Sequence, residues 1–203
     1  VGVQLRCWNV DGCAEQDAED ARRAAEVLGI PFYVLDFEKE YKARVVEYMI
    51  DGYRRGITPN PDVECNREIK FGLFLEKALS MGAPACRQAG IYVATGHYVR
   101  LRRKFPISNF QFPNKSRKYL ENYQIENSLK IENYKLKIAK DRNKDQSYFL
   151  WTLTQDKLRH CLFPIGDYTK PEVRQLARKF GLPNAEKKDS QGICFLGQIR
   201  LGD

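Results

Sequence analysis

The sequence has few of the residues from which metal sites and membrane segments are built. It contains two histidines among 203 residues, no two cysteines stand in a CxxC spacing, and no run of about 18 apolar residues occurs. These shortages argue against a zinc site, an iron–sulfur cluster and a membrane span, and no secretory apolar region is apparent. We therefore expect a cytoplasmic protein whose cysteines are free, metal-bound or catalytic. The six cysteines are Cys7, Cys13, Cys65, Cys86, Cys161 and Cys194.

The basic charge is unevenly distributed. The formal net charge is +8, but Lys104 to Lys140 alone holds eight Lys and Arg against three Glu, a net of +5, which leaves +3 for the rest. Clustered basic residues are typical of nucleic-acid binding. A solvated surface segment without a function is the simpler explanation of the same charge.

Short apolar segments alternate with amphipathic ones along most of the chain. This alternation predicts an α/β fold with a parallel sheet covered by helices. Strands are expected at 1–5, 32–37 and 91–95, and helices at 14–28, 41–56, 62–82 and 169–181. Thr169 and Glu172 are predicted to form a capping box around Pro171 at the start of the last helix. The apolar run 32–37 is expected to be a buried strand. The inward faces of the last three helices are predicted to be Tyr41, Val45, Met49 and Tyr53; Phe71, Leu75, Ala78 and Leu79; and Val173, Leu176, Ala177 and Phe180.

The segment 104–137 interrupts this pattern. It is rich in Asn, Lys and Tyr, and "ENYQIENSLKI" is followed at once by the similar "ENYKLKI". Such composition is typical of a low-complexity insertion at the surface. We therefore divide the chain into an α/β part (1–103), a basic insertion (104–137) and a remaining part (138–203) with the second cysteine loop; the resemblance described below implies that the first part binds a nucleotide.

Two loops present residues suited to chemistry. In "TPNPDVEC", a turn braced by prolines places Cys65 three residues after Asp62, and a helix start can lower the pKa of a thiol. In "ATGHY", Gly96 and His97 follow a predicted strand, at the sheet edge where α/β proteins bind ligands. Each residue also has a purely structural explanation. Cys65 could be a half-buried cysteine, Gly96 a glycine that ends a strand, and His97 a histidine whose hydrogen bonds are made within the protein.

Several long motifs, taken in order, resemble one enzyme family. "GITPNPDVECNREIKFGLFLEKAL", "ATGHYVR", "RNKDQSYFLWTL", "LFPIGDYTKPEVRQLARKFGLP" and "AEKKDSQGICF" resemble the catalytic domain of the bacterial tRNA-specific 2-thiouridylases and their mitochondrial counterparts. The resemblance covers nearly everything outside the insertion. It implies a Rossmann-like ATP-pyrophosphatase domain of the PP-loop type.

The resemblance also implies a reaction. The C2 oxygen of a tRNA wobble uridine would be adenylated by ATP with Mg²⁺ and then displaced by sulfur. Cys194 matches the cysteine that carries sulfur as a persulfide, Cys65 matches the nucleophile that resolves it, and Asp62 matches the acid/base group. A disulfide between the two cysteines would require Cα atoms within about 7 Å.

Further residues match binding positions of that family. Gly96 and Leu5 match positions at ATP, where Leu5 replaces the usual methionine. Asn60, Pro61 and Asp62 match contacts to the target uridine, which would be flipped into the site. His97, Lys144, Asp145 and Gln146 match tRNA contacts. For "KDQ" the structural alternative is a helix N-terminus at which Asp145 favours the dipole.

The sequence also departs from the family pattern. The SGGxDS loop that grips the ATP pyrophosphate does not occur, Val1 already matches the second strand, and the two C-terminal β-rich domains are expected to be absent. Cys7, Cys13, Cys86 and Cys161 match nothing functional.

The expected partners are tRNA and an upstream persulfide donor, and we expect a monomer. The rival functions are another ATP-pyrophosphatase with a different acceptor, and an inactive gene remnant or RNA-binding fragment.

Overall fold

The computed structural model describes residues 1–7, 13–81, 90–104 and 133–187. The first half contains β1 (Gly2–Arg6), α1 (Cys13–Val27), β2 (Phe32–Asp36) and two long helical runs. The first run comprises α2 (Glu38–Tyr41), a π-helical stretch (Lys42–Val46) and α3 (Glu47–Arg54). The second comprises α4 (Pro61–Glu64), a π-helical stretch (Cys65–Leu73) and α5 (Phe74–Ser80).

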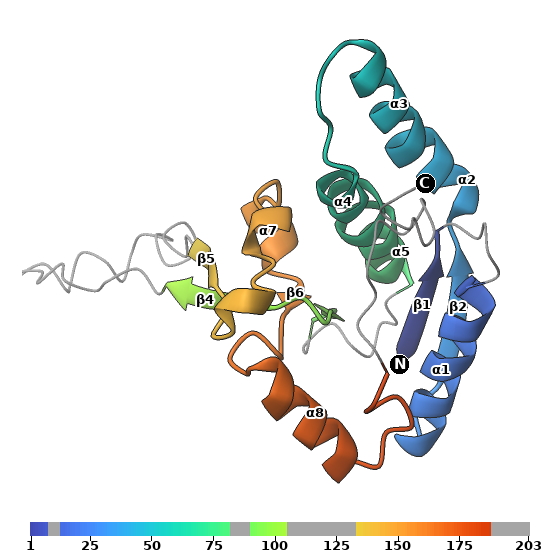
Figure 1. The fold of residues 1–203 in the computed structure, drawn as a ribbon, viewed down its shortest axis with the longest axis vertical. Helices are drawn as coiled ribbons and strands as arrows, with labels where there is room; N and C mark the ends of the chain where they lie inside the picture. The colour runs from blue at the N-terminus through green and yellow to red at the C-terminus, as the bar shows by residue number, and fades with distance from the viewer. Residues whose placement is uncertain (8–12, 82–89, 105–132, 188–203) are drawn as a thin grey trace, which may run out of the picture.

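The second half is built mainly of short elements (Figure 1). Its strands are β3 (Val93–Ala94), β4 (Val99–Lys104), β5 (Asn133–Ile138) and β6 (Cys161–Leu162). Its helices are α7 (Gln155–Leu158), α8 (Lys170–Lys179) and single 3₁₀ turns at Arg142–Lys144 and Ser147–Phe149.

Parallel strand pairing confirms the predicted α/β class. Strand β1 pairs with β2 in parallel, with Leu5 opposite Leu35, and β3 pairs in parallel with β6. In the described ranges these are two separate pairs rather than one sheet. The predicted strand 91–95 is shorter than expected, although Thr95 N–H still donates to the Leu162 carbonyl at 3.0 Å.

The segment 32–37 forms the predicted strand, as β2, but the prediction that this strand is buried was wrong. The side chains of Tyr33 and Val34 are 58% and 45% exposed. The described residues give β2 one strand neighbour, β1, and Tyr33 lines an open cleft. A continuous apolar run indicates burial on both faces only where another layer covers each face.

Two hydrophobic cores lie on either side of the second helical run. The first contains Phe37, Tyr41, Val45, Val46, Cys65 and Ile69. The second contains Phe71, Val99, Leu150, Leu153, Leu158, Cys161 and Phe163. Because Ile69 and Phe71 belong to different cores, the run that carries α4 and α5 joins the two halves, and Figure 1 shows it between them.

Strands β4 and β5 form an antiparallel hairpin, with Val99 opposite Ile138 and Lys104 opposite Asn133. Residues 133–137, which the sequence analysis placed in the insertion, thus belong to β5. Tyr134 and Leu136 pack against the second core. Behind the hairpin, a Cβ on Gly166 would meet the Val99 carbonyl oxygen at 1.9 Å, so this close approach requires glycine.

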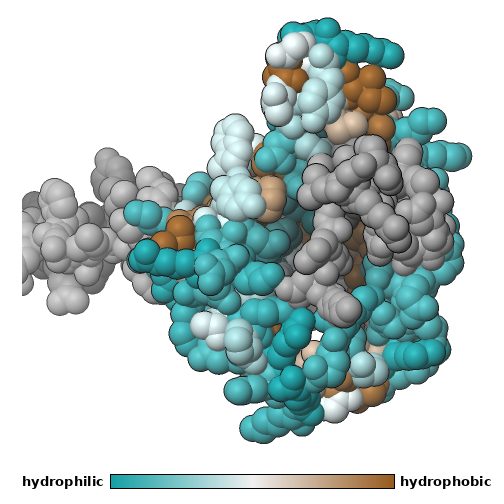
Figure 2. Space-filling view, viewed as in Figure 1, coloured by the Kyte–Doolittle hydropathy of each residue, from teal (hydrophilic) through white to brown (hydrophobic). Residues whose placement is uncertain are grey.

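The predicted helix faces are wrong at their C-terminal ends. Tyr41, Val45, Phe71 and Leu75 are buried, whereas Tyr53, Leu79 and Phe180 are exposed. The predicted capping box of Thr169 and Glu172 at the start of α8 is confirmed, although α8 buries no residue fully. Figure 2 shows a mostly hydrophilic face with hydrophobic patches near α3, where Ile50, Tyr53 and Ile57 are exposed. No helix in the described ranges could cross a membrane.

Candidate functional site

The turn before α4 is held by its own side chains. Asn60 caps the helix, and its Oδ1 accepts hydrogen bonds from Asp62 N–H and Val63 N–H, both at 3.1 Å. Pro61 occupies the first helical turn, where its fixed φ suits the helix and its missing N–H costs nothing. The Asn60 cap and Pro61 therefore fix the backbone at the start of the helical run that carries Asp62 and Cys65.

Asp62 and Cys65 have pKa values shifted in opposite directions. Burial raises the pKa of the Asp62 carboxyl, partly offset by the charge of Lys70. A hydrogen bond with Cys7 lowers the pKa of the Cys65 thiol; burial and Asp62 oppose this shift, and Lys70 adds to it. A raised carboxyl pKa suits proton exchange near neutral pH, and a lowered thiol pKa favours the nucleophilic thiolate.

The helix start is not what lowers the pKa of Cys65. Cys65 lies one full turn inside the helical run, where its N–H already donates to the carbonyls of Pro61 and Asp62. The amides that a helix presents to an anion belong to its first turn. The stabilising groups are instead Cys7 and Lys70, which come from β1's end and from the helix itself.

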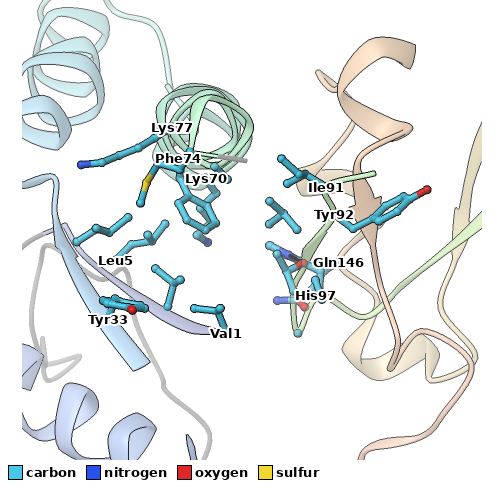
Figure 3. A pocket seen from close by; sticks show the side chains of 18 residues that line it. Val1, Leu5, Tyr33, Lys70, Phe74, Lys77, Ile91, Tyr92, His97 and Gln146 are labelled. Atoms are coloured by element: carbon cyan, nitrogen blue, oxygen red, sulfur yellow. Dashed lines mark hydrogen bonds between the residues drawn. The ribbon is translucent and has the colours of Figure 1, made fainter. Parts of the chain in front are cut away.

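A cleft of about 930 Å³ separates the two halves of the molecule. Figure 3 shows Leu5, Tyr33, Lys70 and Phe74 on one side of it, and His97 on the other. Most of the lining is apolar, with Lys70 and Lys77 as its cations. This size and chemistry match small-molecule sites, which are concave and mostly apolar with a few polar groups.

Gly96 lies where the first cleft meets a second cavity of about 550 Å³. A Cβ built on Gly96 would meet one protein atom within 4 Å, Ile165 Cδ1 at 4.0 Å. The backbone there faces open space, so a ligand in the cleft could approach it closely. The second cavity is polar and lined by Lys144, Lys170 and Lys187.

Comparison with known proteins gives this site a family context. The family described as "tRNA methyl transferase HUP domain" matches residues 1–198. The chain belongs to this family. The match accounts for the parallel strands and confirms the α/β fold expected from the sequence.

Curated relatives in this family share 41–46% identity with the chain. A protein of Akkermansia muciniphila, named tRNA-specific 2-thiouridylase MnmA, is 45% identical over all of this chain and 49% of its own length. A protein of the same name from Flavobacterium johnsoniae is 44% identical over 99% of this chain and 45% of its own length. A Geobacillus kaustophilus protein, named tRNA-specific 2-thiouridylase MnmA 1, is 46% identical over 98% of this chain and 46% of its own length. The chain thus spans about half the length of the curated relatives it matches.

Four of the residues singled out in the sequence line the large cleft of this HUP domain. They are Leu5, Gly96, His97 and Gln146. Leu5 also packs against the first core, which contains Cys65. Asp62 and Cys65 do not themselves line the cleft, but the core that contains Cys65 packs against Leu5 and Phe74, which do.

His97 has the surroundings of a satisfied core histidine as well as a place in the cleft. Its Nδ1 is hydrogen-bonded to Thr95 Oγ1 at 2.8 Å, and its ring lies 5.9 Å from that of Phe71 and 6.2 Å from that of Phe163. Burial, with a smaller effect of Lys70, lowers the pKa of His97 to about 3. The imidazole is thus neutral at physiological pH, and any contact it makes with RNA is a hydrogen bond or a stacking contact.

Asp145 and Gln146 support the backbone around the second cavity. Asp145 accepts hydrogen bonds from Ala139 N–H and the Ser147 hydroxyl, both at 2.7 Å. Gln146 Oε1 accepts from Tyr98 N–H at 2.9 Å. Both side chains hold the loop between β5 and α7, whereas Lys144 lines the cavity and is the member of the trio suited to contact phosphate.

Cys194 lies outside the described residues, so its predicted approach to Cys65 stays a prediction. Within the described ranges, no group of three His, Cys, Asp or Glu side chains could hold a metal ion.

Sequence reasoning missed two residues of this site. Lys70 influences the pKa of Asp62, Cys65 and His97, and it lines the cleft. Its spacing of five residues after Cys65 on one helix was a usable signal. Cys7 was taken as functionless, but it packs against the core that contains Cys65 and lowers the pKa of that thiol, a relation that no local pattern reveals.

Proposed function

We propose that this chain is the catalytic portion of a tRNA 2-thiouridylase, which replaces the C2 oxygen of a wobble uridine with sulfur in an ATP-dependent reaction. The observation that carries the proposal is the arrangement of Asp62 and Cys65, one helical turn apart, beside a cleft of nucleotide size. The names of the relatives support it.

The cleft suits a nucleotide. Leu5 and Phe74 offer apolar contact area for a base, Gly96 leaves room for close approach, and Lys70 and Lys77 supply positive charge for phosphates. A bound ATP would supply the adenylyl group that turns the uridine C2 oxygen into a leaving group. Mg²⁺ would enter with the nucleotide, since it is commonly held through substrate phosphates.

The residues of α4 and its turn would act on the activated uridine. The turn of Asn60 and Pro61 would hold the flipped base, and Asp62, whose carboxyl pKa is raised by burial, would exchange a proton with it. The terminal sulfur of a Cys194 persulfide would attack C2 as AMP leaves. The Cys65 thiolate would then attack the Cys194 sulfur, forming a disulfide and releasing 2-thiouridine.

The tRNA would lie over the second cavity. Lys144 and the neutral His97 would contact it, and the loop held by Asp145 and Gln146 would fix their positions. Lys144 and Lys170 would offer positive charge to the phosphate backbone, whereas Lys187 is paired with Asp17 and Asp20. We further propose a cytoplasmic monomer that receives its persulfide sulfur from an upstream donor protein.

A chimera tests the function directly. The matched region of the Akkermansia relative is replaced by this chain, and 2-thiouridine in tRNA is measured by mass spectrometry of nucleosides after incubation with ATP and a persulfide donor. We expect thiolation by the chimera and none by its Cys65→Ser or Cys194→Ser variants. The matched control is Cys13→Ser, which removes a cysteine without an assigned role and should retain activity.

The other outcomes favour the rival functions. ATP-dependent pyrophosphate release without thiolation would indicate an ATP-pyrophosphatase with another acceptor. Binding of tRNA without either reaction would indicate an RNA-binding fragment. Full thiolation by the Cys65→Ser chimera would refute the assigned nucleophile.

A further inference from the structure

The C-terminal end of α3 carries exposed aromatic, aliphatic and basic side chains. Tyr53 is 57% exposed, Ile57 is 49% exposed and Ile50 is 40% exposed. Arg54 and Arg55 are exposed beside them. We call these five residues the α3 tip. Figure 1 shows α3 at one end of the molecule, and Figure 2 shows hydrophobic patches among hydrophilic side chains there.

Backbone hydrogen bonds define the shape of the α3 tip. Gly56 has a φ of +71°, and its N–H donates to the Tyr53 carbonyl at 3.0 Å. Ile57 N–H donates to the Gly52 carbonyl at 2.9 Å. These two bonds form the Schellman motif, which ends a helix at a glycine with left-handed backbone. Because the backbone is already held in one conformation, a ligand does not have to order it on binding.

The α3 tip packs against the turn that precedes α4. Gly52 is buried, and a Cβ built on it would meet Pro59 Cγ at 3.1 Å and Pro59 Cβ at 3.2 Å. Pro59 is followed by Asn60, whose side chain caps the helical run that carries Asp62. The exposed side chains of the tip are therefore held next to the turn of the candidate site.

The two arginines of the tip have a simple structural explanation, which covers only part of the surface. Cations at a helix C-terminus favour the helix dipole. Arg55 also pairs with Asp51 at 3.7 Å, but both side chains are more than 60% exposed, and such pairs contribute little stability. In the described ranges no hydrogen bond or ion pair engages the Arg54 side chain. Neither the dipole nor the ion pair accounts for the exposed ring of Tyr53.

We propose that the α3 tip binds the unpaired RNA nucleotides that flank the target uridine. Tyr53 stacks on one base, and Arg54 and Arg55 contact the adjoining phosphates. Unpaired RNA bases are commonly held on aromatic rings, and guanidinium groups bind phosphate. Because an RNA chain is continuous, the neighbours of a base held at the Asn60 turn must pass close to that turn. The identity of this RNA rests on the proposed function.

Fluorescence anisotropy tests the contact. The full 203-residue chain is titrated into a labelled RNA hairpin whose unpaired loop contains uridine. Tyr53→Ala should weaken binding by about 5- to 150-fold, the range that corresponds to the loss of one base–aromatic stack. Tyr53→Phe retains the ring and should bind like the parent chain. Arg54→Gln should weaken binding and reduce the slope of log affinity against log salt concentration by about 0.7.

Matched controls come from the opposite end of the molecule, near α8 (Figure 1). Tyr168→Ala removes another exposed tyrosine, and Arg178→Gln removes another exposed arginine; both variants should bind like the parent chain. Circular dichroism checks that each variant is folded. Equal affinities of the parent chain and Tyr53→Ala would overturn the proposal. An equal loss in Tyr168→Ala, or no binding of the hairpin by the parent chain, would also overturn it.

The thiolation chimera separates this inference from the proposed function. In an active chimera, Tyr53→Ala should raise the KM for tRNA and leave kcat close to that of the parent. An inactive chimera, with hairpin binding that still depends on Tyr53, would refute thiolation and support the RNA contact. An active chimera whose hairpin binding is indifferent to Tyr53 would refute the RNA contact alone. If Tyr53→Ala slowed only sulfur delivery from the donor protein, the tip would be a protein contact and the proposal would fail.

Discussion

Removal of the Asn60 side chain should destabilise the turn that carries the candidate site. Asn60 Oδ1 satisfies two N–H groups of the first turn of α4, at 3.1 Å each. Replacing an Asn N-cap with Ala typically costs about 1 kcal/mol, within a range of about 0.5–2 kcal/mol. For a chain of this size, each kcal/mol lowers Tm by about 2–4 °C. We therefore expect Asn60→Ala to lower Tm by a few degrees in differential scanning calorimetry.

The matched control is Asn60→Asp, which retains an oxygen acceptor at the cap and adds a charge that the helix dipole favours. It should melt close to the parent protein. If the Asn60 amide also contacts the target uridine, Asn60→Asp should lose thiolation in the chimera while keeping its stability. The capping argument would be refuted if Asn60→Ala had the same Tm as the parent protein. It would also be refuted if Asn60→Asp had a Tm as low as that of Asn60→Ala.

Three further changes test the electrostatics and the packing. Lys70→Met should raise the pKa of the Cys65 thiol, measured from thiolate absorbance at 240 nm across a pH titration. The folded state lowers the pKa of His97 to about 3, below the value of about 6.5 in an unfolded chain. The neutral imidazole therefore contributes its full share of the unfolding free energy above pH 6.5, and this share is lost as the pH falls towards 3. His97→Gln should reduce the loss of unfolding free energy between pH 6.5 and 3, measured by urea denaturation. Phe71→Ala should cost about 3–5 kcal/mol of unfolding free energy, since Phe71 is 0% exposed, whereas Phe180→Ala, at 58% exposed, should change it by about 0.5 kcal/mol or less.

Each of these has a control or a contradicting result. Lys77→Met removes the other cleft cation and should leave the Cys65 titration unchanged. A His97→Gln profile that still falls as steeply as the parent between pH 6.5 and 3 would assign the acid sensitivity to other groups. Equal losses for Phe71→Ala and Phe180→Ala would contradict the assignment of the second core.

The sequence predicted local structure well where a few neighbouring residues determine it. The capping box of Thr169 and Glu172 and the Pro-braced turn before Asp62 depend on hydrogen bonds within three residues, and both formed where expected. Strand and helix types followed from the spacing of apolar residues. The ends of helix faces were less predictable, because Tyr53 and Phe180 continue the apolar spacing beyond the layer that covers it.

Burial on β2 and the extent of the hairpin could not be predicted in the same way. Tyr33 is exposed because of what lies beside the strand, not because of its own sequence. Residues 133–137 have a low-complexity composition, yet they pair with β4, whose partner groups lie some thirty residues earlier. In both cases the deciding interaction is between segments far apart in the chain.

By itself, the sequence determined the family, the α/β class and the turn that presents Asp62 and Cys65, because these depend on motif order, periodicity and capping chemistry. Only the tertiary structure decided that Cys7 packs against the core that contains Cys65, that Lys70 influences Asp62, Cys65 and His97 together, and that one cleft joins Leu5 to Gly96. Those contacts arise when β1 and the second half of the chain pack against opposite sides of one helical run. Contacts between segments that are far apart in the sequence cannot be predicted from the spacing of neighbouring residues.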